Sequence, residues 1–169
     1  MARIEYYDPE KASDRTNDMV QKNRSMNIFK MLAHSESHLV NYCRLGAAIR
    51  HRGELDPCLR ELAITRTGDL CDAEYEVVAH KRIGREVGLS EDKINAIEQG
   101  AGASVYSMLE NQILAFTDDV VCNTRPSDET FNSVRDALTP GALVELHLAI
   151  GYYVMTSKIL RSFDIDLER

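Results

Sequence analysis

Residues 60–89 have the sequence RELAITRTGDLCDAEYEVVAHKRIGREVGL, and this stretch predicts two helices joined by a short connection. Just before it, Asp56 and Pro57 supply an N-cap and a first-turn proline, which are typical of a helix start. Asp72 is in position to cap the second helix, and Gly88 is the type of residue that ends one. We therefore expect two short helices packed against each other.

The sequence on either side of this stretch repeats the same helix signals. Ser90 and Ser127 are candidate caps of short helices, and Thr139-Pro140 precedes a last helix that ends near Ser162. Further helices are predicted at residues 26–32, at 39–49, and in a segment whose inner face carries Leu109, Ile113, Leu114, Phe116, Val120 and Val121. No long segment alternates apolar and polar residues, and no Asn-Gly or Asp-Gly hairpin turn is present.

These patterns predict an all-α protein, a bundle of about six to eight helices. A chain of 169 residues fits a single domain, which we place at residues 1–169 with its core at 29–165. There is no internal repeat, low-complexity segment or composition change that marks a domain boundary.

Composition and charge exclude several classes of function. The net charge of -7, with Lys and Arg scattered among acidic residues, argues against a nucleic-acid partner. No apolar run is long enough to cross a bilayer, and the first residues lack the pattern of a signal peptide, so we expect no membrane partner and a cytoplasmic location. The four cysteines include no Cys-x-x-Cys pair and are expected to be reduced.

Glu61, Glu76 and His80 are the candidate catalytic residues. Glu76 and His80 are four residues apart, so they lie on the same face of one helix. Glu61 belongs to the preceding helix, and packing of the two helices can bring it against the imidazole. A carboxylate beside histidine stabilises the imidazolium, which is the arrangement needed to transfer a proton. Spacing alone also fits a Glu–His pair on a solvated helix face, and that alternative stays open.

Three segments carry a resemblance to a known family. RELAITRTGDLCDAEYEVVAH, followed by GLSEDKINAI, resembles the core motif of the carboxymuconolactone decarboxylase and alkylhydroperoxidase D superfamily. ELHLAIGYYVMTSKIL, from Glu145 to Leu160, is similar to the closing helix of that family. The resemblance covers the chain from about Phe29 onward. It implies a helical bundle of the alkylhydroperoxidase D-like type.

The resemblance also separates two branches of the superfamily. In the peroxidase branch, a Glu is followed by two redox cysteines and a histidine, and the matching positions here are Glu61, Ala73, Glu76 and His80. The proton-transfer residues are therefore present and both cysteines are absent. A dithiol peroxidase needs one thiolate to attack the peroxide and a second to resolve it. The pattern is instead similar to the decarboxylase branch, which also has Glu four residues before its histidine.

Weaker candidates surround this group. Arg66 is expected either to bind a substrate carboxylate or to form an internal ion pair with a site glutamate. His147 is expected in the core, in an interface or at the site. Tyr152 and Tyr153 are expected to pack, or one of them to point its hydroxyl into the cleft. His34 and His38 have the spacing of metal ligands, but no third ligand is evident, so no metal is expected.

Three readings of the function follow from the resemblance and the residues. The first is a cofactor-free decarboxylase, or a related lyase or isomerase, acting on a small carboxylated lactone or keto acid through Glu61, Glu76 and His80. The second is a peroxidase of the same fold that uses Cys71 alone. The third is a non-catalytic helical oligomer.

A homo-oligomer, whether dimer, trimer or hexamer, is expected in every reading. Members of the family typically assemble in this way. The segment at 26–32 also offers apolar side chains that exceed the needs of one domain, namely Met26, Ile28, Phe29, Met31 and Leu32.

Overall fold

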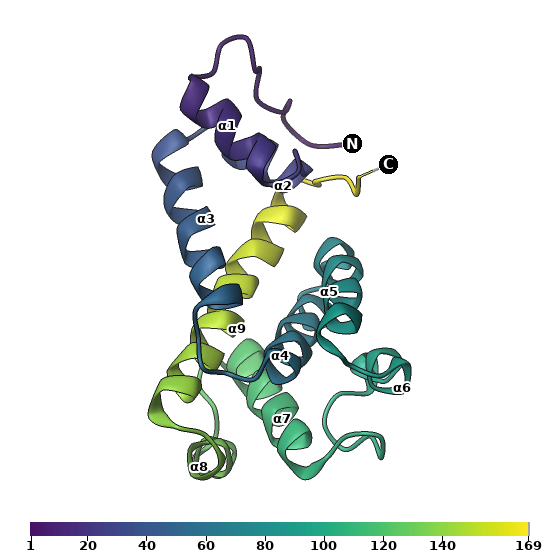
Figure 1. The fold of residues 1–169 in the computed structure, drawn as a ribbon. Coiled ribbons are helices and arrows are strands. Elements are labelled where there is room, and N and C mark those ends of the chain that lie inside the picture. Colours follow the sequence, from purple (N-terminus) through teal and green to yellow (C-terminus); the bar gives the residue numbers. More distant parts are fainter. Residues whose placement is uncertain (169) are drawn as a thin grey trace.

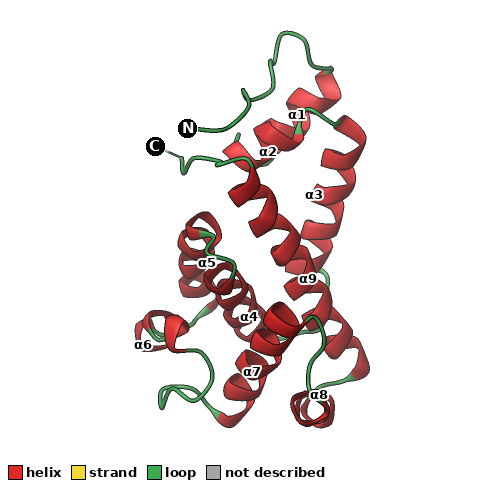
Figure 2. Cartoon of the chain, turned by 180° about the vertical axis from the view of Figure 1, so that it is seen from behind, coloured by secondary structure: helices red, strands yellow, loops and turns green. Residues whose placement is uncertain are grey.

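A computed structural model describes residues 1–168, and over these residues the regular structure is entirely helical (Figure 1). The elements are α1 (Asp14–Lys22), α2 (Asn27–Leu32), α3 (Glu36–His51), α4 (Pro57–Leu70), α5 (Glu74–Val87), α6 (Glu91–Asn95), the 3₁₀ helix η1 (Ile97–Gln99), α7 (Met108–Asn123), α8 (Asp128–Ala137) and α9 (Pro140–Ser162). Figure 2 shows helices and loops and no strand over this part of the chain. The predicted all-α fold class is confirmed.

The nine α-helices of residues 1–168 slightly exceed the predicted number, because the apolar pattern does not predict α1. That helix has the sequence DRTNDMVQK and buries only Thr16 and Val20. Its sequence signal is the cap, since the Ser13 hydroxyl accepts from the backbone N of Thr16 at 3.1 Å. None of the helices in residues 1–168 combines the length and apolarity that a bilayer span requires.

Helix α4 lies between α5, α7 and α9 and forms the centre of the fold (Figure 1). Every residue of 59–68 is buried, so this helix has no solvent-facing side. Its polar groups must therefore find partners inside the protein. The hydroxyls of Thr65 and Thr67 donate to the backbone carbonyls of Glu61 and Ala63, at 2.6 and 2.8 Å. The charged side chains of α4 take partners both from α4 itself and from other helices.

The helix starts mostly follow the caps read from the sequence. Asp56 accepts from the backbone N of Cys58 and Leu59 at 2.8 and 3.1 Å, and Gly88 ends α5 with φ of 109°. The expected cap of α5 is wrong by one residue. Ala73 holds the N-cap position, while Asp72 turns into the left-handed region with φ of 53°.

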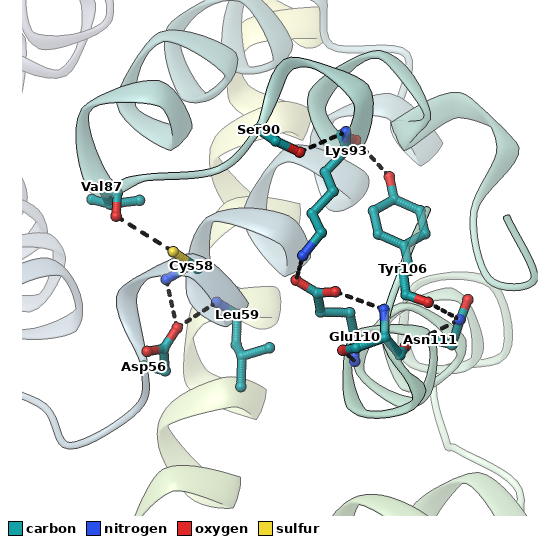
Figure 3. Close-up of polar contacts among 10 residues, drawn as sticks. Asp56, Cys58, Leu59, Val87, Ser90, Lys93, Tyr106, Glu110 and Asn111 are labelled. Carbon is teal, nitrogen blue, oxygen red and sulfur yellow. Dashed lines mark hydrogen bonds and ion pairs between the residues drawn. The ribbon is translucent and has the colours of Figure 1, made fainter. Parts of the chain in front are cut away.

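Helix α6 is held against α7 by a polar network at the far side of α4 (Figure 3). The ammonium of Lys93 forms an ion pair with Glu110 at 2.6 Å, and the hydroxyl of Tyr106 donates to the Lys93 carbonyl at 2.7 Å. The second oxygen of Glu110 accepts from the backbone N of Ser107 at 2.8 Å. Each of these groups is bonded to another, so the network holds α6 and the segment before α7 against the start of α7.

The two ends of the described chain lie side by side (Figures 1 and 2). The backbone N of Arg3 donates to the carbonyl of Phe163 at 2.9 Å, and its guanidinium pairs with Asp164 at 2.8 Å. The side chain of Glu168 accepts from the backbone N of Asn27 at 2.7 Å. The residues that follow α9 therefore hold the start of α2 in place.

The apolar residues of α2 do not form the free surface that the sequence pattern indicates. Ile28 and Met31 are 3% and 4% exposed and pack in a cluster with Tyr75, Leu160 and Ile165 of the same chain. The reason is that α2 folds back against α5 and the end of α9. Large exposed apolar side chains lie instead on α9, at Val144, Leu148 and Met155.

Helices α4 and α5 approach closely at Gly68. A Cβ added there would lie 3.0 Å from the Cβ of Glu76 and 3.3 Å from the backbone N of Val77. We therefore expect Gly68→Ala to lower stability by about 1–3 kcal/mol, as overpacking does in a tight core. Thermal unfolding followed by circular dichroism measures the change.

Gly151 of α9 supplies the matched control for this substitution. A Cβ added to Gly151 meets nothing within 4 Å, so Gly151→Ala should raise stability by about 0.5–1 kcal/mol through helix propensity alone. Equal effects of the two alanine substitutions would show that the contact between α4 and α5 has been misassigned.

Candidate active site

Glu61 lies in the middle of α4 and has no exposed surface. Its Oε2 lies 2.6 Å from Nδ1 of His80, which comes from α5. Its Oε1 accepts a hydrogen bond from Nε of Arg60 at 3.1 Å. Both oxygens of this carboxylate are therefore bonded to cationic groups, which is how a buried charge becomes tolerable.

Glu76 lies one helical turn before His80 on α5, and its Oε2 is 3.3 Å from Nε2 of the imidazole. Glu76 and His80 are 5% and 4% exposed. The alternative of a solvated surface pair therefore does not describe them. The structure brings together the three residues Glu61, Glu76 and His80, with the imidazole between the two carboxylates.

The ionisation of His80 is set by a competition between burial and charge. Burial disfavours the imidazolium, but the carboxylates of Glu61 and Glu76 outweigh it and raise the pKa of His80 to about 9. Burial also opposes ionisation of Glu61, yet His80 and Arg60 together lower the pKa of that carboxyl below its ordinary value. At neutral pH the histidine is therefore positively charged and Glu61 is negatively charged.

These residues lie in the wall of a cavity of about 540 Å³, a size suited to a small organic molecule. The cavity is bounded by the segment before α2 and by parts of α3, α4, α5 and α9. Its aromatic wall is formed by Phe29, Tyr42, Tyr75, Tyr152 and Tyr153. Its basic side chains are Lys22, Arg24, Arg50, His51, Arg60 and Arg82. An apolar cavity with a few convergent charged groups is the usual form of a small-molecule site.

The tyrosines of α9 take different positions at this site. The ring of Tyr153 meets the ring of His80 edge-on, with centroids 4.6 Å apart and planes at 79°. Tyr152 also lines the cavity, but its hydroxyl donates to the backbone carbonyl of Tyr42 at 3.1 Å. Tyr152 therefore contributes its ring to the wall, while its hydroxyl serves to join α3 and α9.

Arg66 does not line the cavity, although the sequence offers it as a substrate ligand. Its guanidinium binds Asp118 through Nε at 2.7 Å and Asp69 through Nη1 at 2.7 Å. It also donates to the carbonyls of Ile97 and Glu98, both at 3.1 Å. Arg66 faces α7 and η1, so it neither lines the cavity nor pairs with a site glutamate, and its ion pairs are with Asp69 and Asp118.

His147 is exposed on α9 and lies outside the cavity lining, with its ring 6.1 Å from that of Phe116. It therefore sits in neither the core nor the site.

His34 and His38 bond to different partners and do not form a shared metal site. Nε2 of His34 bonds the carbonyl of Glu5 at 2.9 Å, while Nδ1 of His38 bonds the Ser35 hydroxyl at 2.7 Å.

Cys71 follows the last residue of α4 and does not line the cavity. Burial raises the pKa of its thiol, and the nearby charge of Lys158 does not offset that effect. A raised pKa lowers the fraction of thiolate, the reactive form of cysteine. The position and ionisation of Cys71 both argue against a role as a displaced redox nucleophile.

Sequence reasoning does not single out Arg50 and Arg60 as site residues, and it leaves open whether Tyr152 or Tyr153 points into the cleft. Arg60 precedes Glu61 directly, and a charged residue within a helix whose neighbours are apolar is a signal of a buried ion pair. Arg50 and Tyr153 come from α3 and α9, far from the motif in sequence. Only the packing of these helices shows that they share a cavity with His80.

Comparisons with known proteins agree with this fold and motif. Residues 39–119 match the model of the carboxymuconolactone decarboxylase family. A solved structure of an uncharacterised peroxidase-related protein from Ralstonia eutropha JMP134, an alkylhydroperoxidase AhpD core, is similar with a TM-score of 0.86 and 15% identity. The match covers 99% of this chain and 92% of that one. No curated protein matches the sequence.

Two further solved structures have the same fold. A protein of unknown function from Agrobacterium tumefaciens has a TM-score of 0.74 and 21% identity, with 80% of this chain and 94% of that chain covered. A Cys-to-Ala variant of a debrominase in complex with 2,3,4-tribromopyrrole has a TM-score of 0.81 and 14% identity, with 99% and 94% covered. The family match over residues 39–119 and the shared fold support a relation to the carboxymuconolactone decarboxylase and alkylhydroperoxidase D-like superfamily.

The ionisation of the Glu61–His80 pair makes stability depend on pH in a definite direction. The pKa of His80 rises from 6.5 to about 9 on folding. The protonated ring therefore stabilises the folded state fully below pH 6.5, and this stabilisation is lost as the pH rises through about 9. The lowered pKa of Glu61 gives a contribution that is present above its ordinary value and is lost on acidification. Thermal unfolding midpoints measured from acidic pH to above pH 9 test both the loss of stability on acidification and the loss at alkaline pH.

The variant His80→Gln supplies the control for the alkaline limb. It retains the approximate size of the side chain but has no proton to lose, so its midpoint should change less between neutral pH and pH values above 9. A wild-type protein whose stability is constant across that interval would mean that His80 is not held as an imidazolium.

Proposed function

We propose that the protein is a cofactor-free acid–base enzyme, a decarboxylase or a related lyase or isomerase that acts on a small carboxylated lactone or keto acid. The observation that carries the proposal is the imidazole of His80, held between the carboxylates of Glu61 and Glu76 in the wall of a cavity of about 540 Å³. The absence of redox cysteines at Ala73 and Glu76 favours this branch of the superfamily over the dithiol peroxidases.

The proposed reaction uses the stored proton of His80. The bond between the substrate carbon and its carboxylate breaks, carbon dioxide leaves, and the electron pair moves into the adjacent carbonyl to form an enolate. The imidazolium then supplies a proton to the carbon, and water later returns a proton to the ring. Because Glu76 faces Nε2, we assign it as a second relay between His80 and the substrate. Glu61 keeps the imidazole oriented and charged from the opposite side.

The setting of the protein is part of the same proposal. We propose a homo-oligomer in the cytoplasm that acts on a small molecule and uses no metal or organic cofactor. The exposed apolar side chains of α9 at Val144, Leu148 and Met155 support an assembly, since large apolar side chains on one helix are typical of subunit contacts.

The proton relay predicts the effect of two substitutions on turnover. His80→Gln cannot transfer a proton near neutral pH and should lower kcat by about a hundredfold or more, the usual contribution of general acid–base catalysis. Glu61→Gln should have a similar effect. The double variant should be little worse than either single variant, because the parts of one relay do not act additively.

Carbon dioxide release from a panel of lactone and β-keto acids identifies a substrate, and the rates of the three variants are then compared on it. Circular dichroism of each variant separates loss of chemistry from loss of fold. Full activity in a folded His80→Gln protein would contradict the proposed mechanism. A change of stability with no turnover on any substrate would favour the non-catalytic oligomer.

The rival peroxidase reading makes an opposite prediction. Because Ala73 and Glu76 stand at the redox positions, no internal disulfide forms between them to complete a peroxidase cycle. We expect no sustained hydroperoxide reduction with a dithiol donor, measured by consumption of the peroxide. Turnover that is present in the wild type and lost in Cys71→Ser, but retained in Cys122→Ser, would establish the rival reading.

A further inference from the structure

We propose that the hydroxyl of Tyr153 and the guanidinium of Arg50 form a binding subsite for the enolate-type oxygen of the ligand, beside His80. This inference rests on the proposed function, because it names the groups that bind the oxygen on which negative charge develops. It assigns Tyr153 as a hydrogen-bond donor and Arg50 as the accompanying cation.

The first observation is that the Tyr153 hydroxyl is without a partner. Tyr153 is 5% exposed, and within residues 1–168 its hydroxyl makes no hydrogen bond to another residue. The other buried or half-buried tyrosines at the cavity are bonded: Tyr42 shares a hydrogen bond of 2.7 Å with Thr156, Tyr152 donates to a carbonyl, and Tyr75 donates to Glu168. The hydroxyl oxygen of Tyr153 is not one of the buried atoms that lack a partner in residues 1–168, so it is accessible from the cavity that Tyr153 lines. Such a group is expected to meet a ligand.

The second observation is that Arg50 is a cation without an anion. Its Nε donates to the carbonyl of Gly46 at 3.3 Å, and it forms no ion pair with any of residues 1–168. Two other arginines of the cavity have acidic partners, since Arg60 pairs with Glu61 and Arg82 pairs with Glu86. Arg50 is half-buried on α3, so its charge is only partly screened by solvent. Its terminal nitrogens are available for an anionic ligand.

The charge balance around His80 favours one negative charge in the ligand. The carboxylates of Glu61 and Glu76 are offset by the imidazolium of His80 and the guanidinium of Arg60. Arg50 therefore adds a positive charge that the inner cavity does not neutralise. A monoanion bound there neutralises the charge of Arg50, whereas a neutral ligand of the same shape does not.

The ionisation of Tyr153 agrees with a donor role. Burial and the charge of Glu76 raise its pKa well above the ordinary value, and the charge of Arg50 acts in the opposite direction. The hydroxyl therefore keeps its proton at neutral pH and donates to an anion. A donor held in place before the reaction stabilises an oxyanion without reorganisation. Because its ring packs on His80, the subsite lies next to the proton donor.

The test uses 4-nitrophenolate as the probe, because its oxygen mimics an enolate and its absorbance changes when it binds. Titrations are made at a pH above the pKa of the probe and below the value of about 9 for His80. We expect saturable binding to the wild-type protein and binding about tenfold weaker to Tyr153→Phe, the usual effect of losing one hydrogen bond to a charged group. Arg50→Met should weaken binding at least as much.

Tyr106→Phe is the matched control, since Tyr106 does not line the cavity and its hydroxyl is occupied by the Lys93 carbonyl, and its affinity should equal that of the wild type. The neutral analogue 4-nitroanisole should bind the wild type and Tyr153→Phe equally. If Arg50→Met fails to fold, Arg50→Lys, which keeps the charge but changes the geometry, takes its place and should weaken binding less than Tyr153→Phe. Absence of saturable phenolate binding, or equal weakening by Tyr106→Phe and Tyr153→Phe, would overturn the proposal.

The binding test is independent of turnover. Phenolate binding with the expected pattern, together with no decarboxylation of any substrate, would refute the proposed reaction and leave the subsite established. Turnover that depends on His80 but is unaffected by Tyr153→Phe and Arg50→Met would keep the reaction and refute the subsite.

Discussion

The bond between Glu61 and His80 is the interaction on which the rest of this structure depends. A carboxylate at the centre of a helix that is buried on all sides is costly unless cationic partners meet both of its oxygens. His80 supplies one partner from α5, and Arg60 supplies the other. The close approach at Gly68 lets α5 lie near enough for that bond. The register of the two central helices is therefore set by an ion pair as well as by apolar packing.

The sequence predicts the fold class and the grouping of Glu61, Glu76 and His80, because both follow from patterns within single helices and from the packing of two neighbouring ones. The caps at Asp56 and Thr139 and the spacing of Glu76 and His80 are properties of single helices. The rest of the cavity depends on tertiary packing. Tyr153 is adjacent to another tyrosine in sequence, and only the orientation of α9 shows which hydroxyl is free. Arg66 was misplaced for the same reason, since a helix buried all round gives no pattern that tells which neighbour each side chain faces.

The second carboxylate changes what the shared scaffold is suited to do. Glu76 occupies a position that holds a redox cysteine in the peroxidase branch, and Ala73 occupies the other. A carboxylate at 3.3 Å adds a second negative neighbour to His80, and together with Glu61 it holds the pKa of the imidazole near 9. Such a ring stores a proton at neutral pH. The site thereby has the properties of a proton donor in place of those of an electron-transfer pair.

The contacts between the two chain ends have a consequence for how the protein is made. The segment before α2 that covers the cavity is held by Glu168, which bonds both Asn27 and Tyr75. A growing chain can bring Glu61 and His80 together once α4 and α5 have formed, although the helices α7 and α9 that bury this pair follow later in the sequence. The segment before α2 can be fixed over the cavity only after Glu168 has been synthesised, because contacts between residues so distant in sequence form late in folding. In a nascent chain the pair of Glu61 and His80 thus stays open to solvent until the later helices are made, and the order of synthesis sets the moment at which the cavity is enclosed.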